Sequence, residues 1–225
     1  MRIAYASTVV LAMALLLPSV NGAPYQDADK KVAGGGISAP GWQGKADKGE
    51  SVNDSKFVKE GNTLHLTSGP AAFYWNPADT AKGNFTVKAT FREPKQTMSH
   101  PHPFGVFIGG SKLDSDQPTL LYCVAYRDGS YLVRGFSGGT VMTLTRKQAN
   151  PAVHKTAGPE EEVTQEVAWS VKDGRAECSI NGTVVGGFAQ AELVGPGKLE
   201  SIDGIAGIRV AHNTDVYITN FGVSK

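Results

Sequence analysis

Tyrosines and arginines are concentrated in one short stretch, residues 120–136, LLYCVAYRDGSYLVRGF. Proteins bind sugars through aromatic rings that stack on C–H-rich surfaces and through Arg, Asn or Asp side chains that hydrogen-bond hydroxyls. The stretch supplies both kinds of side chain. The residues that we expect to contact such a ligand are Tyr122, Tyr126, Arg127, Tyr131, Arg134 and, from an earlier aromatic cluster, Trp75. The alternative is that each tyrosine favours a strand and packs with its hydroxyl at the sheet edge.

Two histidines lie two positions apart in His100-Pro101-His102-Pro103, so they point the same way in an extended segment. This pair could begin a metal site, but the sequence shows no third ligand and the prolines alone explain a stiff loop. We therefore expect no metal there. If the loop lies over a ligand-binding surface, either histidine could act as a base or hydrogen-bond a sugar. These two residues and Arg92 are the candidate catalytic residues.

The acidic residues give no clear pair for glycoside hydrolysis, which needs two carboxylates on either side of the scissile bond. Those in or beside strands are scattered, and the turns that contain Asp128 and Asp173 are sufficient to explain these two. The sequence also lacks a Walker loop, a His-Glu-x-x-His motif and a paired Cys-x-x-Cys. None of these motifs therefore assigns a reaction.

Short strands separated by turn residues must position these side chains. Residues 120–126 and 130–136 predict a hairpin around Asp128-Gly129. Residues 83–92 alternate most clearly between apolar and polar side chains, which predicts a half-buried antiparallel strand. Further strands are expected at 104–108, 141–145, 163–172, 175–180, 183–188, 205–210 and 215–223, with a polar insertion at 146–162 and one helical turn within 189–203. The absence of a sustained helical period predicts an all-β sandwich or barrel.

Several strand motifs recur in a known order: Trp42, Gly61-Asn62-Thr63-Leu64, residues 84–92 (NFTVKATFR), Trp169-Ser170-Val171, Ile180-Asn181-Gly182 and residues 216–223 (VYITNFGV). In this order the chain resembles the concanavalin A-like lectin/glucanase superfamily, and within it the laminin-G-like and 3-keto-disaccharide hydrolase-type domains. The resemblance covers about residues 41–225. It implies a jelly-roll β-sandwich of two curved antiparallel sheets, with ligands on the concave sheet or its rim loops.

The resemblance also implies alternatives for function and cofactors. Calcium is common in relatives, and Asp215 near Asn213 is the candidate metal ligand, although no dense acidic loop is present and we expect no cofactor. The Glu-x-Asp-x-x-Glu motif of family-16 glucanases is absent. Residues 99–105, SHPHPFG, replace the Asn-Ser-Gly segment that usually follows the Phe-Arg strand of the keto-disaccharide hydrolase-type domains.

The amino-terminal sequence predicts export. Residues 1–22 have a positive start, a short apolar run and small residues at the end, as in a cleaved signal peptide, so we expect a secreted or periplasmic protein. Residues 23–40 are polar and Gly-rich and predict a flexible leader before one domain at 41–225. Cys123 and Cys178, the only cysteines, could form a disulfide or remain separate buried thiols.

The bulk composition limits the partners. The net charge is +1 with both signs scattered, which provides no electrostatic surface for nucleic acid, and no other stretch is long and apolar enough for membrane insertion. Our first hypothesis is an exported, lectin-like, non-catalytic protein with a carbohydrate ligand. The alternatives are a glycoside hydrolase acting on 3-keto-disaccharides or glucans, and a structural laminin-G-like module with a protein partner. One sandwich fold hosts all three functions.

Overall fold

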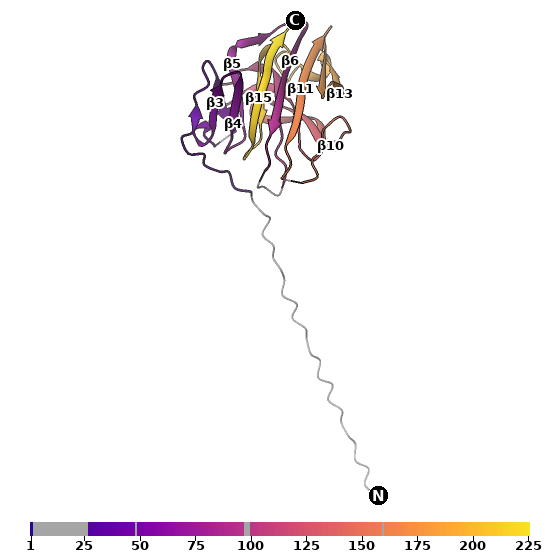
Figure 1. Cartoon of the computed structure of the whole chain (residues 1–225). Coiled ribbons are helices and arrows are strands. Elements are labelled where there is room, and N and C mark those ends of the chain that lie inside the picture. Colours follow the sequence, from indigo (N-terminus) through magenta and orange to yellow (C-terminus); the bar gives the residue numbers. More distant parts are fainter. Residues whose placement is uncertain (2–26, 48, 97–99, 159) are drawn as a thin grey trace.

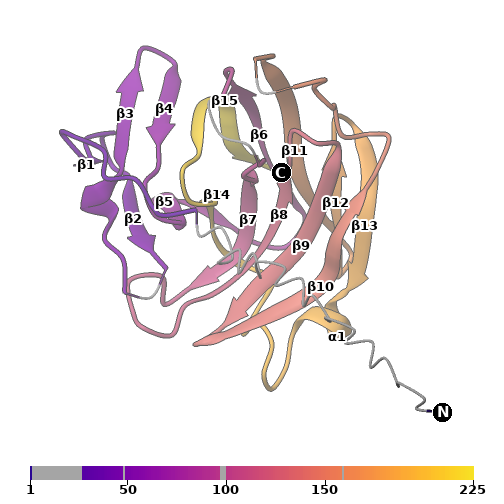
Figure 2. The same ribbon diagram turned by 90° about the horizontal axis from the view of Figure 1, so that it is seen from below.

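Two β-sheets packed face to face form the molecule in the computed structural model, which describes residues 1, 27–47, 49–96, 100–158 and 160–225 (Figures 1 and 2). The eight-stranded sheet has the order β1 (Gly36–Ile37), β3 (Lys56–Glu60), β4 (Thr63–Thr67), β15 (Asp215–Ser224), β6 (Phe85–Glu93), β11 (Val163–Lys172), β12 (Arg175–Ile180) and β13 (Thr183–Ala189). The seven-stranded sheet has the order β10 (Thr140–Ala149), β9 (Ser130–Ser137), β8 (Thr119–Ala125), β7 (Phe104–Ser111), β14 (Gly204–Val210), β5 (Ala72–Ala81) and β2 (Gln43–Ala46).

Strand pairing is antiparallel throughout the described sheets except between β1 and β3. The helices of the described residues are the short η1 (Val52–Asp54) and α1 (Gln190–Leu193), and α1 falls where one helical turn was expected. None of the helices in the described part of the chain is long and apolar enough to cross a membrane. The predicted all-β jelly-roll sandwich is confirmed.

The predicted turns form because their residues tolerate a positive φ. Asp173 and Gly174 have φ values of 49° and 75°, and Asn181 and Gly182 have values of 50° and 80°. Two successive positive φ angles are the requirement of the tight turn that matches the right-handed twist of a hairpin. The β11–β12–β13 meander is therefore encoded locally by these two dipeptides.

Alternation along β6 determines which side chains enter the core. Phe85, Val87, Ala89 and Phe91 are buried, whereas the residues between them are exposed or half-buried. Side chains of successive strand residues point to opposite faces of a sheet, so this pattern directs one face of β6 between the sheets. The core also contains the fully buried ring of Trp169 from β11.

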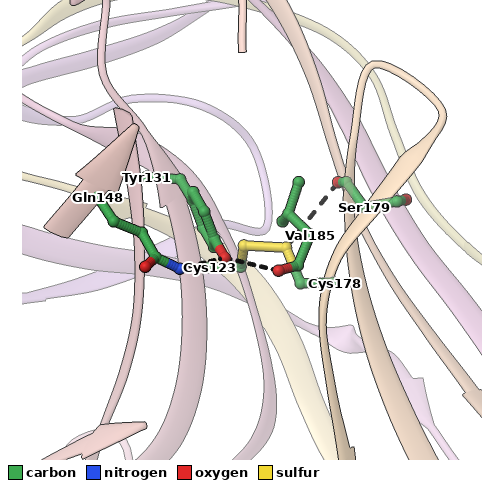
Figure 3. Close-up of a disulfide and its surroundings, with 6 residues drawn as sticks. All are labelled: Cys123, Tyr131, Gln148, Cys178, Ser179 and Val185. Atoms are coloured by element: carbon green, nitrogen blue, oxygen red, sulfur yellow. Dashed lines mark hydrogen bonds between the residues drawn. A yellow bond between two sulfur atoms is a disulfide. The ribbon is translucent and has the colours of Figure 1, made fainter. Parts of the chain in front are cut away.

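A disulfide joins the two sheets through that core (Figure 3). Cys123 lies on β8 of the seven-stranded sheet and Cys178 on β12 of the eight-stranded sheet, with their Cα atoms 6.4 Å apart. Both side chains are fully buried. The pairing that the sequence left open is therefore a cross-link between the layers of the sandwich.

The polar insertion expected at 146–162 begins later than predicted, because β10 continues to Ala149. The pairing of β10 with β9 shifts register between Thr143 and Thr145 and again between Thr145 and Gln148. Such bulges break the period of two on which a sequence scan depends. The prediction therefore ended this strand too early.

The leader expected at 23–40 is attached to the sandwich over its described part, 27–40. The backbone N–H of Lys30 donates to Oδ1 of Asn213 at 2.8 Å, and β1 pairs with β3. Gly69 leaves room for this segment, since a Cβ there would lie 1.9 Å from the carbonyl oxygen of Lys30. Residues 2–22 of the expected signal peptide and residues 23–26 of the leader lie outside the described residues.

Candidate functional site

A second apolar cluster covers the outer face of the seven-stranded sheet, the face directed away from the other sheet. We call it the aromatic face, and its rings are those of Phe73, Trp75, Phe107, Tyr122, Tyr126 and Phe136. Alternation along β5, β7, β8 and β9 brings these rings together from segments far apart in the sequence. The face of a sheet that is directed away from the core is normally polar, so a cluster of aromatic rings on it needs an explanation.

Tyr122 and Arg134 are direct neighbours on this face, because they are register partners in the β8–β9 pair. The Nε atom of Arg134 is buried without a hydrogen-bond partner among the described residues. Burial raises the pKa of Tyr122, although the charges of Arg209 and Arg134 oppose this shift. The phenol therefore stays protonated at neutral pH and can both donate and accept a hydrogen bond.

Cationic side chains lie over the rings. The guanidinium carbon of Arg209 is 5.4 Å from the ring centroids of both Tyr122 and Phe136, and Nζ of Lys147 is 4.1 Å from that of Tyr126. These distances fall within the range of cation–π attraction. Burial raises the pKa of Tyr126 to about 12, so this hydroxyl also remains neutral. The face thus combines apolar rings, neutral phenols and positive charges.

The rings are too deeply buried to act as a stacking platform for a sugar. Trp75, Tyr122 and Tyr126 are 4%, 7% and 9% exposed, and Leu113 from the loop after β7 packs against the same cluster. A ligand would therefore meet the polar groups above the rings rather than broad ring faces. Four of the predicted residues lie on this face: Trp75, Tyr122, Tyr126 and Arg134. Their rings expose too little surface for stacking to be the main contact with a ligand.

Two predicted ligand contacts, Tyr131 and Arg127, do not belong to the aromatic face. Tyr131 is an odd number of residues from Arg134 on β9, so its side chain enters the core, where its hydroxyl donates to the Val185 carbonyl at 2.6 Å (Figure 3). Gln148 donates to the same hydroxyl at 2.8 Å. The prediction grouped Tyr131 with Tyr122 and Arg134 because of their residue types alone. Successive side chains of a strand point to opposite faces of the sheet, so these three residues do not share one face.

Arg127 is buried at the end of β6 instead. Its Nη1 atom lies 3.6 Å from Oε2 of the fully buried Glu93 and donates to the Pro94 carbonyl at 3.3 Å. Burial raises the pKa of Glu93 to about 7, against the opposing effects of Arg127 and a hydrogen bond from Gln96. The guanidinium therefore compensates a buried acid and has a structural position.

Sequence reasoning missed Arg209 and Asp47. The guanidinium of Arg209 forms two hydrogen bonds to the Asp47 carboxylate, at 2.6 and 2.7 Å, and its side chain is 9% exposed. Arg209 is the only charged residue in the apolar strand β14, which was the available signal. Nothing in the sequence around Asp47 indicated its partner, since 162 positions separate the two residues.

Arg92 lies on the outer face of the other sheet, where it lines a groove of about 350 Å³. Its guanidinium carbon is 4.1 Å from the Tyr217 ring centroid, and its Nη1 lies 2.7 Å from Oε2 of Glu162. The groove is lined by Glu60, Thr63, Thr90, Arg92, Thr164, Tyr217 and Thr219. Arg92 is therefore engaged away from His100 and His102, and the three candidate catalytic residues do not form one site.

Asp215, the candidate calcium ligand, contacts a histidine. Its Oδ1 atom lies 2.8 Å from Nε2 of His65 and accepts a hydrogen bond from the Thr67 hydroxyl at 3.3 Å. It does not belong to the group of three or more metal-ligating side chains found in the described part of the chain. The structure thus gives Asp215 neighbours other than the oxygen-rich shell that Ca²⁺ requires.

His100 and His102 instead meet Asp27 and His212, and we call these four residues the histidine cluster. One ligating atom from each lies within 4.8 Å of all the others. Burial and the charge of His212 lower the pKa of His102 to about 4, while Asp27 opposes this shift. The third and fourth members come from the leader and the β14–β15 loop, so the sequence motif around His100 could not reveal them.

No family model and no curated protein matches this chain. Among solved structures, the chain is similar to a carbohydrate-binding module, CBM66, of Bacillus subtilis at 8% identity and a TM-score of 0.57, covering 82% of this chain and 96% of that one. A Bacillus subtilis protein of unknown function with a galectin-like fold has 14% identity and a TM-score of 0.56, with 81% and 88% covered.

A family-16 endo-glucanase from Bacteroides ovatus is similar at 9% identity with a TM-score of 0.51, covering 79% of this chain and 92% of that one. At these identities the comparisons concern the fold alone. All three share the two-sheet architecture described above. The chain therefore has the fold of the concanavalin A-like lectin/glucanase superfamily, as the sequence resemblance predicted.

Proposed function

We propose that this protein binds a carbohydrate on the aromatic face and does not cleave it. The observation that carries this proposal is the position of Arg134 beside Tyr122, with the Nε atom of Arg134 buried and without a hydrogen-bond partner among the described residues. A buried donor without a partner is costly, and a small shift of the Arg134 side chain that lets a ligand hydroxyl accept its hydrogen would remove that cost.

The chemistry around this pair suits a polyhydroxylated ligand. Sugar sites combine an apolar surface with a few fixed donors and acceptors. Here Tyr122 and Tyr126 supply neutral phenols, and Arg209 supplies a guanidinium that Asp47 holds through two hydrogen bonds. Fixed polar groups lose little conformational entropy on binding, so this arrangement is prepared for hydroxyl recognition.

The structural comparisons support the same class of ligand. The similar Bacillus subtilis structure is named as a carbohydrate-binding module, and the similar Bacteroides ovatus structure as an endo-glucanase. Because one fold hosts several functions, these names add support only together with the chemistry of the aromatic face.

The acids near the aromatic face support binding rather than hydrolysis. Asp47 is held by Arg209, and Asp128 lies 2.7 Å from Nζ of Lys147. Burial raises the pKa of Asp128, but hydrogen bonds from Lys147 and Ser130 outweigh it and keep the pKa below its usual value. A glycosidase needs one carboxylic acid with a raised pKa opposite a second carboxylate. Neither acid has the environment of a proton donor.

Export to a secreted or periplasmic location is part of the proposal. It is supported by the signal-like pattern of residues 1–22 and by the disulfide between Cys123 and Cys178, because disulfides persist mainly in oxidising compartments. Expression of residues 1–225, followed by cell fractionation and mass determination of the intact protein, tests this point. Retention in the cytosol with an uncut amino terminus would contradict it.

The binding test is a glycan array followed by titration of the best ligand, with mass spectrometry of the recovered sugars. We expect intact sugars, and we expect Arg134→Ala to weaken binding by about 10-fold or more, since a hydrogen bond to a charged group contributes roughly 1.5–3 kcal/mol. Arg175→Ala is the matched control, because Arg175 is an exposed arginine on β12.

Unchanged binding by the Arg134 variant, with circular dichroism showing that it is folded, would exclude the aromatic face. Cleaved sugars would replace the proposal with glycoside hydrolysis. Binding of a protein ligand, with no response to any glycan, would favour the laminin-G-like alternative.

A further inference from the structure

The histidine cluster brings four metal-ligating side chains together from three separate segments. Asp27 precedes β1, His100 and His102 lie between β6 and β7, and His212 lies between β14 and β15. The Nε2 atoms of His102, His100 and His212 lie 2.8, 2.9 and 3.8 Å from Oδ2 of Asp27. Three imidazoles therefore direct the same ring nitrogen toward one carboxylate oxygen.

These separations match those of ligands around one small cation. In a tetrahedral site with zinc–ligand bonds of about 2.0–2.1 Å, neighbouring ligand atoms are about 3.4 Å apart. The three measured separations, 2.8–3.8 Å, lie on both sides of that value. The remaining separations, between ligating atoms of the three histidines, are at most 4.8 Å, so the side chains would draw together around a bound cation.

The surroundings of the cluster hold its members in this orientation. Nδ1 of His212 lies 2.7 Å from Oδ1 of Asp29, so an Nδ1–H donated there leaves the Nε2 lone pair available to a metal. A carboxylate behind a histidine ligand is the usual outer partner in metal sites, where it fixes the ring and raises its basicity. Asp29 is thus a positioning residue that is separate from the four ligating side chains.

The leader segment that carries Asp27 is also fixed by hydrogen bonds of its own. Asn213, the residue after His212, donates from Nδ2 to the Ala28 carbonyl at 3.1 Å and accepts from the Lys30 N–H at 2.8 Å. Asn213 is itself 6% exposed. Asp27 and His212 are therefore held side by side by contacts that do not involve their own side chains.

We propose that Asp27, His100, His102 and His212 bind one Zn²⁺ ion. Three imidazoles and one carboxylate are a donor set that zinc prefers, whereas Ca²⁺ and Mg²⁺ require mostly oxygen ligands. Four protein ligands complete a tetrahedral shell, which is typical of a structural site. The ion would clamp the leader to the β6–β7 and β14–β15 loops. This site is independent of the carbohydrate proposal.

The two histidines that suggested this possibility in the sequence lacked a third ligand there. The structure supplies His212 and Asp27 across long sequence separations, 75 positions between His102 and Asp27 alone. The expectation of no metal at the His100-Pro101-His102-Pro103 loop rested on that missing ligand. Its premise does not hold in the folded chain.

The test uses the purified protein without a polyhistidine tag, stripped with EDTA, dialysed and titrated with ZnCl₂ by calorimetry. We expect one Zn²⁺ per chain. His102→Ala and His212→Ala should each weaken binding by about 100-fold or more, and Asp29→Ala by about 10-fold, the usual range for an outer partner. His65→Ala and His154→Ala are matched controls, since they are the two histidines outside the cluster, and should bind normally.

Asp27→Asn keeps the proposal testable if a histidine variant fails to fold, because Asp27 precedes the first strand of the sandwich. In the original protein, Zn²⁺ should slow trypsin cleavage after Lys30 and Lys31, and Asp27→Asn should lose most of that protection. Absence of stoichiometric binding would overturn the proposal. It would also be overturned by equal binding in folded His102→Ala and His212→Ala, or by equal loss in the two control variants.

Discussion

Arg209 and Asp47 form a two-pronged ion pair, with Nη1 and Nη2 of Arg209 at 2.6 and 2.7 Å from the two carboxylate oxygens of Asp47. Arg209 lies on β14, an interior strand of the seven-stranded sheet, and Asp47 follows the edge strand β2. The same guanidinium lies over Tyr122 and Phe136. The pair therefore links the edge of the seven-stranded sheet to two rings of the aromatic face.

Replacing Asp47 with Ala should destabilise the protein by about 2 kcal/mol, because it leaves a buried guanidinium without its counter-ion. The value is below that of a fully buried pair since the Asp47 side chain is 36% exposed. Asp116→Ala is the control, because Asp116 pairs with Lys45 from a fully exposed position and should change stability by less than about 1 kcal/mol. Urea unfolding measures both values, and equal effects would show that the Arg209 pair has no special role.

The pH dependence of stability should reveal Glu93. Its pKa is raised from the usual 4.5 to about 7 in the folded protein, mainly by burial. The folded state then holds a proton that the unfolded state loses, so the contribution of Glu93 to stability is greatest below pH 4.5 and falls as the pH rises to about 7. At about 1.4 kcal/mol per pKa unit, the decline is at most about 3 kcal/mol.

The variant Glu93→Gln should remove this decline, while Glu166→Gln, at an exposed pair with Lys88, should keep it. The slope of unfolding free energy against pH between 4.5 and 7 is the quantity to compare. A slope that is the same in the original protein and in Glu93→Gln would place the titration elsewhere.

Removal of the disulfide with Cys123→Ala and Cys178→Ala together should cost about 4 kcal/mol, the chain-entropy value for a loop of this size. The two cysteines are 55 positions apart and connect the two sheets. Reductant should lower the unfolding midpoint of the original protein and leave that of the double variant unchanged. A loss below about 1 kcal/mol would mean that the packed core alone holds the sheets together.

Gly105 is required by the close approach of β7 and β8. A Cβ at this position would lie 2.0 Å from the Cys123 carbonyl oxygen and 2.9 Å from the Cα of Val124. Backbone atoms cannot move aside without disturbing strand pairing, so Gly105→Ala should cost about 2–4 kcal/mol. Gly139→Ala, where nothing lies within 4 Å, should change the unfolding free energy by about 0.5 kcal/mol or less. Similar values for the two variants would rule out this steric explanation.

The sequence by itself determined the strands, because strand identity depends on local properties. The period of two in β6 directed Phe85 and Phe91 inward, and the Asp173-Gly174 and Asn181-Gly182 dipeptides ended strands where positive φ was needed. Where the period was interrupted by bulges, as in β10, the prediction ended too early. The fold class could therefore be predicted without any long-range information.

Only the tertiary structure decided which chemical groups meet. Alternation placed Tyr122 and Arg134 together and Tyr131 in the core, although all three lie in one stretch. Asp27 and His212 join His102 because the leader and two loops converge, and nothing in the sequence around any one of them encodes that convergence. Local side-chain and backbone preferences specify strands and turns, whereas sites assembled from distant segments depend on how the whole chain packs.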